Sequence, residues 1–349
     1  MTKLLEIKDQ LIRFYSKYET YLYPLVKFVI AFALFTVINT NIGFMEKISR
    51  FPIALLLSLV CAILPASAIL WIGAIVVLAD MYALSMEVAI TTLILFAILF
   101  FVYFRFAPKD GLVVVLTPLC FKLHIPYVMP VGCSLLRSAY SVIGVVCGTV
   151  VYYFLDGIHR NAGVLMSAAN ADEEQTSSKF DISAGQFLGN KEMYLVIVIF
   201  VLTAIVVYLV RRMEVDNAWT LAIISGALIQ IAGLLVGYIV LGVTGKTLWL
   251  LIGNAISLII AFVLQFLFMN LDYARTERVQ FEDDDYYYYV KAVPKKMVAV
   301  REVTVKHFGN TASMGKRIDH SKSALSPEEE ENSRKVIAKE LDIDEDLLK

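Results

Sequence analysis

The chain has 349 residues, of which 58% are hydrophobic and 18% are charged, with a net charge of −1 at pH 7. Soluble domains carry about 45–50% apolar and about 25% charged residues, so this composition excludes an ordinary soluble protein and indicates a membrane protein. The near-neutral charge favours no strongly charged partner, and we expect the lipid bilayer, and no nucleic acid, as the medium this chain contacts.

The N-terminal segment, residues 1–20, combines four basic residues with apolar side chains at helical spacing. This pattern is typical of an amphipathic helix that lies at a membrane surface, and the alternative is a plain lead-in to the first span. The first crossing is predicted at Leu22–Asn39, with Pro24 near its start. Lys27 lies in this crossing, and its long side chain is expected to reach back to the membrane surface.

A first membrane block is predicted at residues 21–156, and it contains every interior break of the apolar sequence. The breaks come at Pro65, Pro118 and Pro126, because proline lacks an N–H and ends or kinks a helix. In chain order, the apolar segments of this block are Phe51–Leu64, Ala66–Ala83, Val88–Phe104, Gly111–Leu123 and a long one from about Pro130 to Leu155.

A polar loop at residues 157–192 separates this block from a second one at residues 193–270. The second block holds three uninterrupted apolar spans, Met193–Val210, Trp219–Leu241 and Leu248–Met269. About 20 apolar residues in a helix cross a ~30 Å hydrocarbon layer, and in lipid the backbone must satisfy its own hydrogen bonds. The predicted fold class is therefore all-α: a polytopic helical membrane protein of about seven or eight helices, some of them proline-broken or re-entrant, with a small cytoplasmic tail.

Basic residues near the span ends predict which face is cytoplasmic. The N-terminal segment and the sequences around Arg105, Arg211 and Arg275 are basic, whereas the polar loop is rich in Ser, Asn and acidic residues. Both termini are therefore predicted in the cytoplasm, with the protein in the cell membrane. This topology requires residues 51–83 to begin and end outside, as a re-entrant hairpin or two thin crossings. It also makes Gly111–Leu123 re-entrant or interfacial.

The two proline-ended segments, Leu55–Leu64 and Gly111–Leu123, enter the membrane from opposite sides in this topology. Each is a short apolar helix followed by a longer apolar run. Discontinuous helices in inverted repeats are characteristic of secondary transporters, where they form solute sites. The alternative is that these prolines are ordinary features of membrane helices.

The remaining residues, 271–349, are predicted to form a cytoplasmic tail. Its predicted elements are a β-hairpin at 286–306, a linker at 308–323 and a capped helix at 326–341. The hairpin is expected to turn at Pro294–Lys296. Phe281-Glu282-Asp283-Asp284-Asp285 followed by four tyrosines, within residues 270–294, resembles the tail of uncharacterised multi-pass membrane proteins of Gram-positive anaerobes. This resemblance implies a membrane location and no activity.

Arg137 is the charge most indicative of function, because ionisable residues inside a membrane are costly. If its crossing begins near Pro130, Arg137 lies about two turns inside the membrane and should face water, a carboxylate or an anion. The alternative is an interfacial arginine that pairs with lipid headgroups. Lys122 and His124 are expected to line the same inner vestibule as Arg137.

Asp80 and Glu87 form a second candidate group. They are seven residues apart, so a continuous helix would place both on one face as a cation or proton site. A turn near Ser85 would instead place both at the outer surface, and this second interpretation is the favoured one.

The sequence contains no motif of nucleotide, metal or enzyme chemistry. Gly245-Lys246-Thr247 lacks the glycine of a phosphate loop, since Val240 stands five residues earlier. The four cysteines show no CxxC spacing. We therefore expect no cofactor, no metal and no enzymatic activity.

Two functions fit these features. The favoured one is a permease-like or channel-like transport component, with a solute path near Arg137, Asp80, Glu87, Lys122 and His124. The alternative is a membrane scaffold or regulator that binds a cytoplasmic partner through its tail. Either protein could work as a homo-oligomer or as a subunit of a membrane complex.

Overall fold

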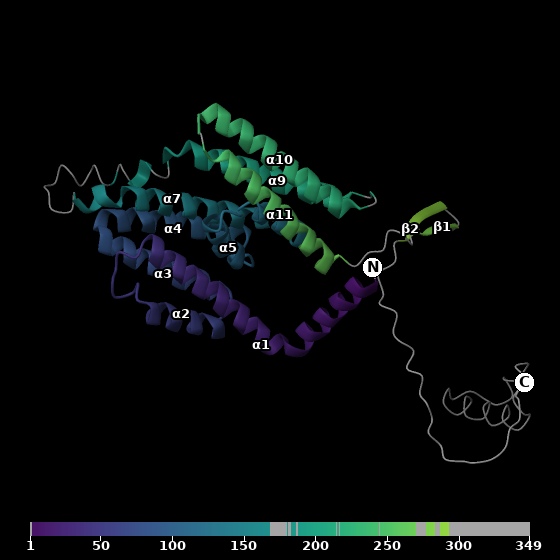
Figure 1. The fold of residues 1–349 in the computed structure, drawn as a ribbon, viewed down its shortest axis with the longest axis horizontal. Helices are drawn as coiled ribbons and strands as arrows, with labels where there is room; N and C mark the ends of the chain where they lie inside the picture. The colour runs from purple at the N-terminus through teal and green to yellow at the C-terminus, as the bar shows by residue number, and fades with distance from the viewer. Residues whose placement is uncertain are drawn as a thin grey trace, which may run out of the picture. The chain divides into compact units, whose positions relative to one another are not determined.

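The computed structural model describes residues 2–167, 180, 183–185, 188–213, 215, 217–243, 245–269, 277–282 and 287–292. Among these residues, seven helices are long and apolar enough to cross a membrane, which confirms an all-α polytopic membrane protein (Figure 1). The first block contains α1 (Thr2–Asn41), α2 (Phe51–Ile63), α3 (Ser67–Leu84), α4 (Met86–Phe106), α5 (Gly111–Lys122), α6 (Val128–Leu136) and α7 (Ser141–Ser167). Next come α9 (Lys191–Arg212), α10 (Ala218–Leu241) and α11 (Thr247–Phe268), followed by strands β1 (Glu277–Glu282) and β2 (Tyr287–Ala292).

The first helix, α1, is bent near its N-terminal third (Figure 1). Tyr18 has non-helical angles (φ −112°, ψ 15°) and lies six residues before Pro24, which remains inside the helix. The part of α1 after the bend packs against α2. This bend separates the predicted surface segment from the first span.

The helix break between α2 and α3 leaves a backbone carbonyl oxygen that accepts a hydrogen bond from a lysine of α1. Pro65 follows α2, and the Ala68 amide bonds the Pro65 carbonyl oxygen (2.8 Å). The Leu64 carbonyl oxygen accepts instead from Lys27 Nζ at 2.7 Å. Lys27 is 5% exposed, so its ammonium group is not turned to the surroundings as expected, because the broken helix beside it offers a buried acceptor.

The α2–α3 pair starts and finishes at the same end of the helix bundle. The 13 residues of α2 rise about 20 Å, less than a ~30 Å hydrocarbon layer. Near the end of α3, an Asp80 oxygen accepts from the backbone N–H of Met45 at 3.1 Å, and Met45 precedes α2. The α2–α3 pair therefore begins and ends on the same side, as the distribution of basic residues predicts for residues 51–83.

The α5–α6 pair is a second helical hairpin. α5 has 12 residues and α6 has 9, so they rise about 18 Å and about 14 Å. Asp110 precedes α5, Arg137 follows α6, and the two side chains form a salt bridge. The hairpin therefore begins and ends at one end of the bundle, which is the geometry of a re-entrant pair.

Two predicted boundaries in this region are wrong. The crossing expected from Pro130 to Leu155 is interrupted, since Arg137 is extended (φ −120°, ψ −157°) and α7 begins only at Ser141. At its other end α7 continues to Ser167, so the loop expected from residue 157 starts later. The additional turns begin with an ion pair one turn apart, Asp156 Oδ2 to Arg160 Nη2 at 2.6 Å, and such a pair stabilises a helix.

Small residues allow close packing of the helices, as their spacing predicts. A Cβ on Gly148 of α7 would lie 2.7 Å from the Val114 carbonyl oxygen of α5. On α10, a Cβ on Gly226, Gly233 or Gly237 would lie 2.4–2.6 Å from a side chain of α9. These contacts join α5 to α7 and α10 to α9, and the three helices α9, α10 and α11 confirm the predicted uninterrupted spans.

The C-terminal β-hairpin differs from the expected one. β2 contains Tyr287–Ala292 as expected, but it pairs antiparallel with the upstream strand β1, with Glu277 opposite Ala292 and Glu282 opposite Tyr287. The upstream strand β1 was not recognised in the sequence, and the predicted turn at Pro294–Lys296 lies outside the described residues. The predicted partner strand, the linker and the terminal helix lie outside the described residues.

Candidate functional site

The base of the α5–α6 hairpin is an ionic cluster, here called the basic end of the bundle. Asp110 pairs with Arg137, and its second oxygen accepts from Ser141 Oγ at 2.6 Å. The Asp110 side chain is 9% exposed and that of Arg137 is 43% exposed. Because Ser141 begins α7, this carboxylate links both arms of the hairpin to the next helix.

A second arginine closes the same base. Arg211, in the last turn of α9, donates to the carbonyl oxygens of Ser134 (3.0 Å) and Leu135. These are carbonyls at the C-terminal end of α6, where a cation also interacts favourably with the helix dipole. The basic end therefore ties the hairpin to α7 and to α9.

The tip of the hairpin is held by buried amides. The Tyr127 carbonyl oxygen accepts from Gln230 Nε2 of α10 at 3.1 Å, and Gln230 Oε1 accepts from Asn254 Nδ2 of α11 at 3.3 Å. Both amide side chains are 1% exposed. His124, in the turn, has φ 60°, and its ring lies 4.9 Å from that of Trp249. The tip thus docks on α10 and α11 within the spans.

An apolar cavity of about 140 Å³ lies between α5 and four neighbouring helices, α1, α3, α4 and α7. Its walls are mainly aliphatic and aromatic side chains, among them Leu34, Ala74, Phe100, Val115, Leu119 and Val151. One wall of the cavity is therefore the short helix α5, which has 12 residues.

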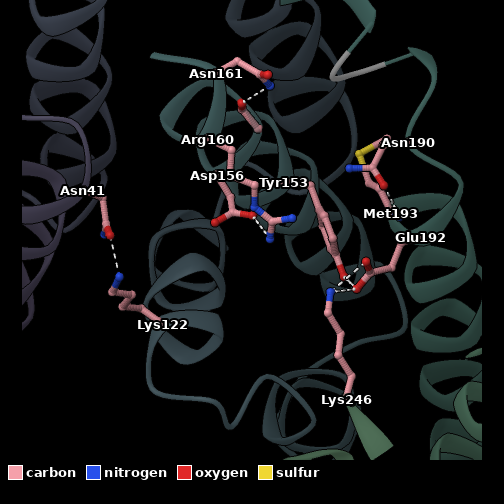
Figure 2. Close-up of polar contacts among 11 residues, drawn as sticks. Asn41, Lys122, Tyr153, Asp156, Arg160, Asn161, Asn190, Glu192, Met193 and Lys246 are labelled. Carbon is pink, nitrogen blue, oxygen red and sulfur yellow. Dashed lines mark hydrogen bonds and ion pairs between the residues drawn. The ribbon is translucent and has the colours of Figure 1, made fainter. Parts of the chain in front are cut away.

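Polar residues gather at one end of this cavity, here called its mouth and defined by Asn41, Lys122, Asp156 and His159. Lys122 Nζ donates to Asn41 Oδ1, and in Figure 2 Lys122 points toward Asn41 while Asp156 points toward Arg160. The mouth lies at the end of α5 that is farthest from Arg137.

The helix starts near the mouth are joined by a further ionic group. Lys246 Nζ contacts Glu192 Oε1 at 2.6 Å and Oε2 at 2.8 Å, and the Tyr153 hydroxyl donates to Oε1 at 3.2 Å (Figure 2). Glu192 opens α9 and Lys246 precedes α11. Helix direction therefore places Asn41, Glu192 and Lys246 at the end of the bundle opposite Arg137.

The structure does not bring the predicted site residues together. Arg137 lies beyond the end of α6, beside a hollow lined by Asp110, Ser138 and Ser141, and not two turns inside a helix. Gly111 begins α5 next to Asp110, the partner of Arg137, and Lys122 ends the helix 11 residues later. This corresponds to a rise of about 16 Å along the helix. The expected shared vestibule of Arg137, Lys122 and His124 is therefore wrong, because α5 separates the two ends.

Asp80 and Glu87 also differ from expectation. The turn near Ser85 is confirmed, since α3 ends at Leu84 and α4 starts at Met86. Asp80 is nevertheless completely buried rather than at the surface, because the loop after α1 covers it and Met45 donates to it. Glu87 is half-buried in the first turn of α4 and accepts from the Ser85 hydroxyl.

Replacing Asp80 by asparagine is expected to stabilise the protein by about 1–3 kcal/mol. Asp80 Oδ2 has no hydrogen-bond partner among the described residues, and a buried charge without a partner is costly. An asparagine oxygen can still accept from Met45, and its neutral amide nitrogen costs less to bury without a partner than a carboxylate charge does. Chemical unfolding of the purified protein in detergent measures the change, with Asp80→Ala, which loses the bond, as the destabilised control. A loss of stability in Asp80→Asn would show that Oδ2 binds a cation, a proton donor or water.

Several of these residues were missed at the level of sequence. The hairpin is organised by four residues, Asp110, Gln230, Asn254 and Arg211. In the sequence, only the position of each residue within or beside an apolar segment could have indicated this role. A glutamine or asparagine in the middle of an apolar span is a polar group that must find a partner in the membrane. Asp110 is the acidic residue in the basic turn after α4, and that contrast is also visible in the sequence.

Comparison with known proteins yields no relative: no family model, no curated protein and no solved structure matches this chain. Within the described residues, no group of three or more His, Cys, Asp or Glu side chains is arranged to hold a metal ion.

Proposed function

We propose that this multi-pass membrane protein is a permease-like transport component of the cell membrane. The observation that carries the proposal is the cavity walled by α5, a helix whose 12 residues are too few to cross a hydrocarbon layer. Broken helices leave backbone groups that protein or water must satisfy, and for that reason they often line solute paths. A protein that only anchors a tail needs neither feature.

The two hairpins supply the second support. α2–α3 returns to the end that carries Met45, and α5–α6 returns to the end that carries Arg137. Short helices that enter from opposite sides are the arrangement on which alternating access is built in several transporter folds. The basic end, with Arg105, Arg137 and Arg211, is proposed as the cytoplasmic side.

Thiol labelling in vesicles tests this proposal without knowledge of the solute. In a chain whose four cysteines are replaced, Ala74→Cys and Leu119→Cys place single thiols on the cavity wall. A charged, membrane-impermeant thiol reagent should modify them from both faces if the cavity opens alternately. Leu202→Cys, on an exposed apolar position of α9, should remain unmodified because it faces lipid.

Two further thiols control for sidedness, and the outcomes are distinct. Arg212→Cys should react only from the cytoplasmic face and Lys246→Cys only from the other. Cavity thiols that react from neither face would contradict transport. They would favour the alternative of a scaffold or regulator, for which the β1–β2 hairpin is the supporting observation, since a two-stranded hairpin is marginally stable alone and gains from a partner.

A further inference from the structure

We infer that the cavity between α1, α3, α4, α5 and α7 binds one hydrocarbon chain of an anionic amphiphile, with the headgroup at the mouth. The inference names a ligand class for the cavity on which the proposed function rests. It follows from where the polar groups lie, how large the cavity is and which charge is left at the mouth.

The first step is the asymmetry of the cavity wall. From Val114 to Lys122, α5 rises about 12 Å along the cavity. The polar side chains Asn41, Lys122, Asp156 and His159 lie at the Lys122 end. At the Val114 end the Tyr103 hydroxyl is already engaged, since it donates to the Pro108 carbonyl oxygen at 2.7 Å. An apolar shaft with a polar mouth matches a molecule with an apolar tail and a polar head.

The second step is the volume. About 140 Å³ is close to the ~150 Å³ of an apolar cavity that accepts one benzene molecule. This space admits about six carbons of a single chain, and it is too small for two chains or a fused-ring body. The rest of a longer chain would extend between helices toward the lipid.

The third step is the charge. Asp156 is neutralised by Arg160, at 2.6 Å between Oδ2 and Nη2. Lys122 is paired with the neutral amide oxygen of Asn41 and forms no salt bridge with any residue that the structure describes. The ammonium group of Lys122 therefore leaves a net positive charge at the mouth. Phosphate and carboxylate headgroups complement this charge, and an ammonium headgroup does not.

The test uses the full chain in phosphatidylcholine vesicles and a photoreactive probe. The probe is a twelve-carbon alkyl phosphate with a diazirine at the sixth carbon, the part of the chain that the cavity holds, and the adducts are located by peptide mass spectrometry. Saturable labelling is expected on cavity-wall residues such as Val115 and Val151. Unlabelled dodecyl phosphate should compete, whereas dodecyltrimethylammonium and inorganic phosphate should not.

Three variants make the test specific. Lys122→Gln should weaken labelling about tenfold, the value of one charge-assisted hydrogen bond. Ala74→Leu should abolish it by filling the shaft. Lys246→Gln, which removes a lysine near the mouth but already paired with Glu192, should leave it unchanged. Unfolding midpoints of all variants confirm that each is folded, and dodecyl phosphate should raise the midpoint of the wild type but not of Ala74→Leu.

Several results would overturn the inference. Labelling that is spread over lipid-facing positions would show that the probe does not bind in the cavity. Labelling that is unchanged in Lys122→Gln would show that Lys122 does not hold the headgroup. Competition by inorganic phosphate equal to that of dodecyl phosphate would assign the mouth to a free phosphate and exclude the amphiphile. The thiol-labelling result does not depend on this probe, so a cavity open to both faces with no amphiphile bound would reject the ligand class and leave transport standing.

Discussion

Arg137→Ala is expected to lower the free energy of unfolding by about 2 kcal/mol. The substitution leaves the Asp110 carboxylate, 9% exposed, without its cation. Removing one partner of a fully buried pair costs about 3–5 kcal/mol, and the value is reduced here because the Arg137 side chain is 43% exposed and partly solvated. Unfolding in a denaturing-detergent titration of the purified protein measures the loss.

A matched control and a rescue separate this effect from a general loss of charge. Arg105→Ala removes an exposed arginine of the same basic end and should change stability little. Adding Asp110→Asn to Arg137→Ala should recover much of the loss, because the neutral amide oxygen can still accept from Ser141. A double variant no more stable than Arg137→Ala would contradict the pairing as the source of the effect.

Gly253→Ala is expected to lower the free energy of unfolding by about 1–3 kcal/mol. The added Cβ would lie 2.5 Å from the His124 carbonyl oxygen and 2.8 Å from the Tyr127 ring. The first of these atoms is backbone in a turn with φ 60° at His124, so it cannot move aside as a side chain can. The expected result is displacement of the hairpin tip, with loss of the hydrogen bond between Tyr127 and Gln230.

The same titration measures this change, and Gly163→Ala is its control. Nothing lies within 4 Å of a Cβ at Gly163, which is in the helical part of α7. Alanine is there the better helix former by about 1 kcal/mol, so this variant should be as stable as the wild type or more stable. Equal behaviour of the two variants would show that the tip does not dock on α11.

Arg137 and Gly253 hold opposite ends of the α5–α6 hairpin. The hairpin is tied at its base by Asp110, Arg137 and Arg211, and at its tip by Gln230 and Gly253. If the hairpin moves during transport, one of these attachments must be released while the other holds. Thiol labelling of the cavity can be repeated in Arg137→Ala, which weakens the base, and in Gly253→Ala, which weakens the tip. The variant in which labelling from one face increases would identify the attachment that is released.

The sequence by itself determined the class of this protein and the order of most of its apolar helices. Long apolar spans and the prolines that interrupt them are local properties, so the three helices of the second block and the break at Pro65 are readable from neighbouring residues. The distribution of basic residues also predicted that residues 51–83 begin and end on one face and that Gly111–Leu123 is re-entrant or interfacial.

Only the tertiary structure decided where the charged side chains lie. Lys122 meets Asn41 across 81 residues, Tyr127 meets Gln230 across 103, and Lys27 finds the Leu64 carbonyl oxygen of a broken helix. Such contacts depend on which helices become neighbours, and apolar spans resemble one another too closely to specify their neighbours. For this reason the polar groups that organise the hairpin and the mouth of the cavity, unlike the helices that carry them, required the folded structure.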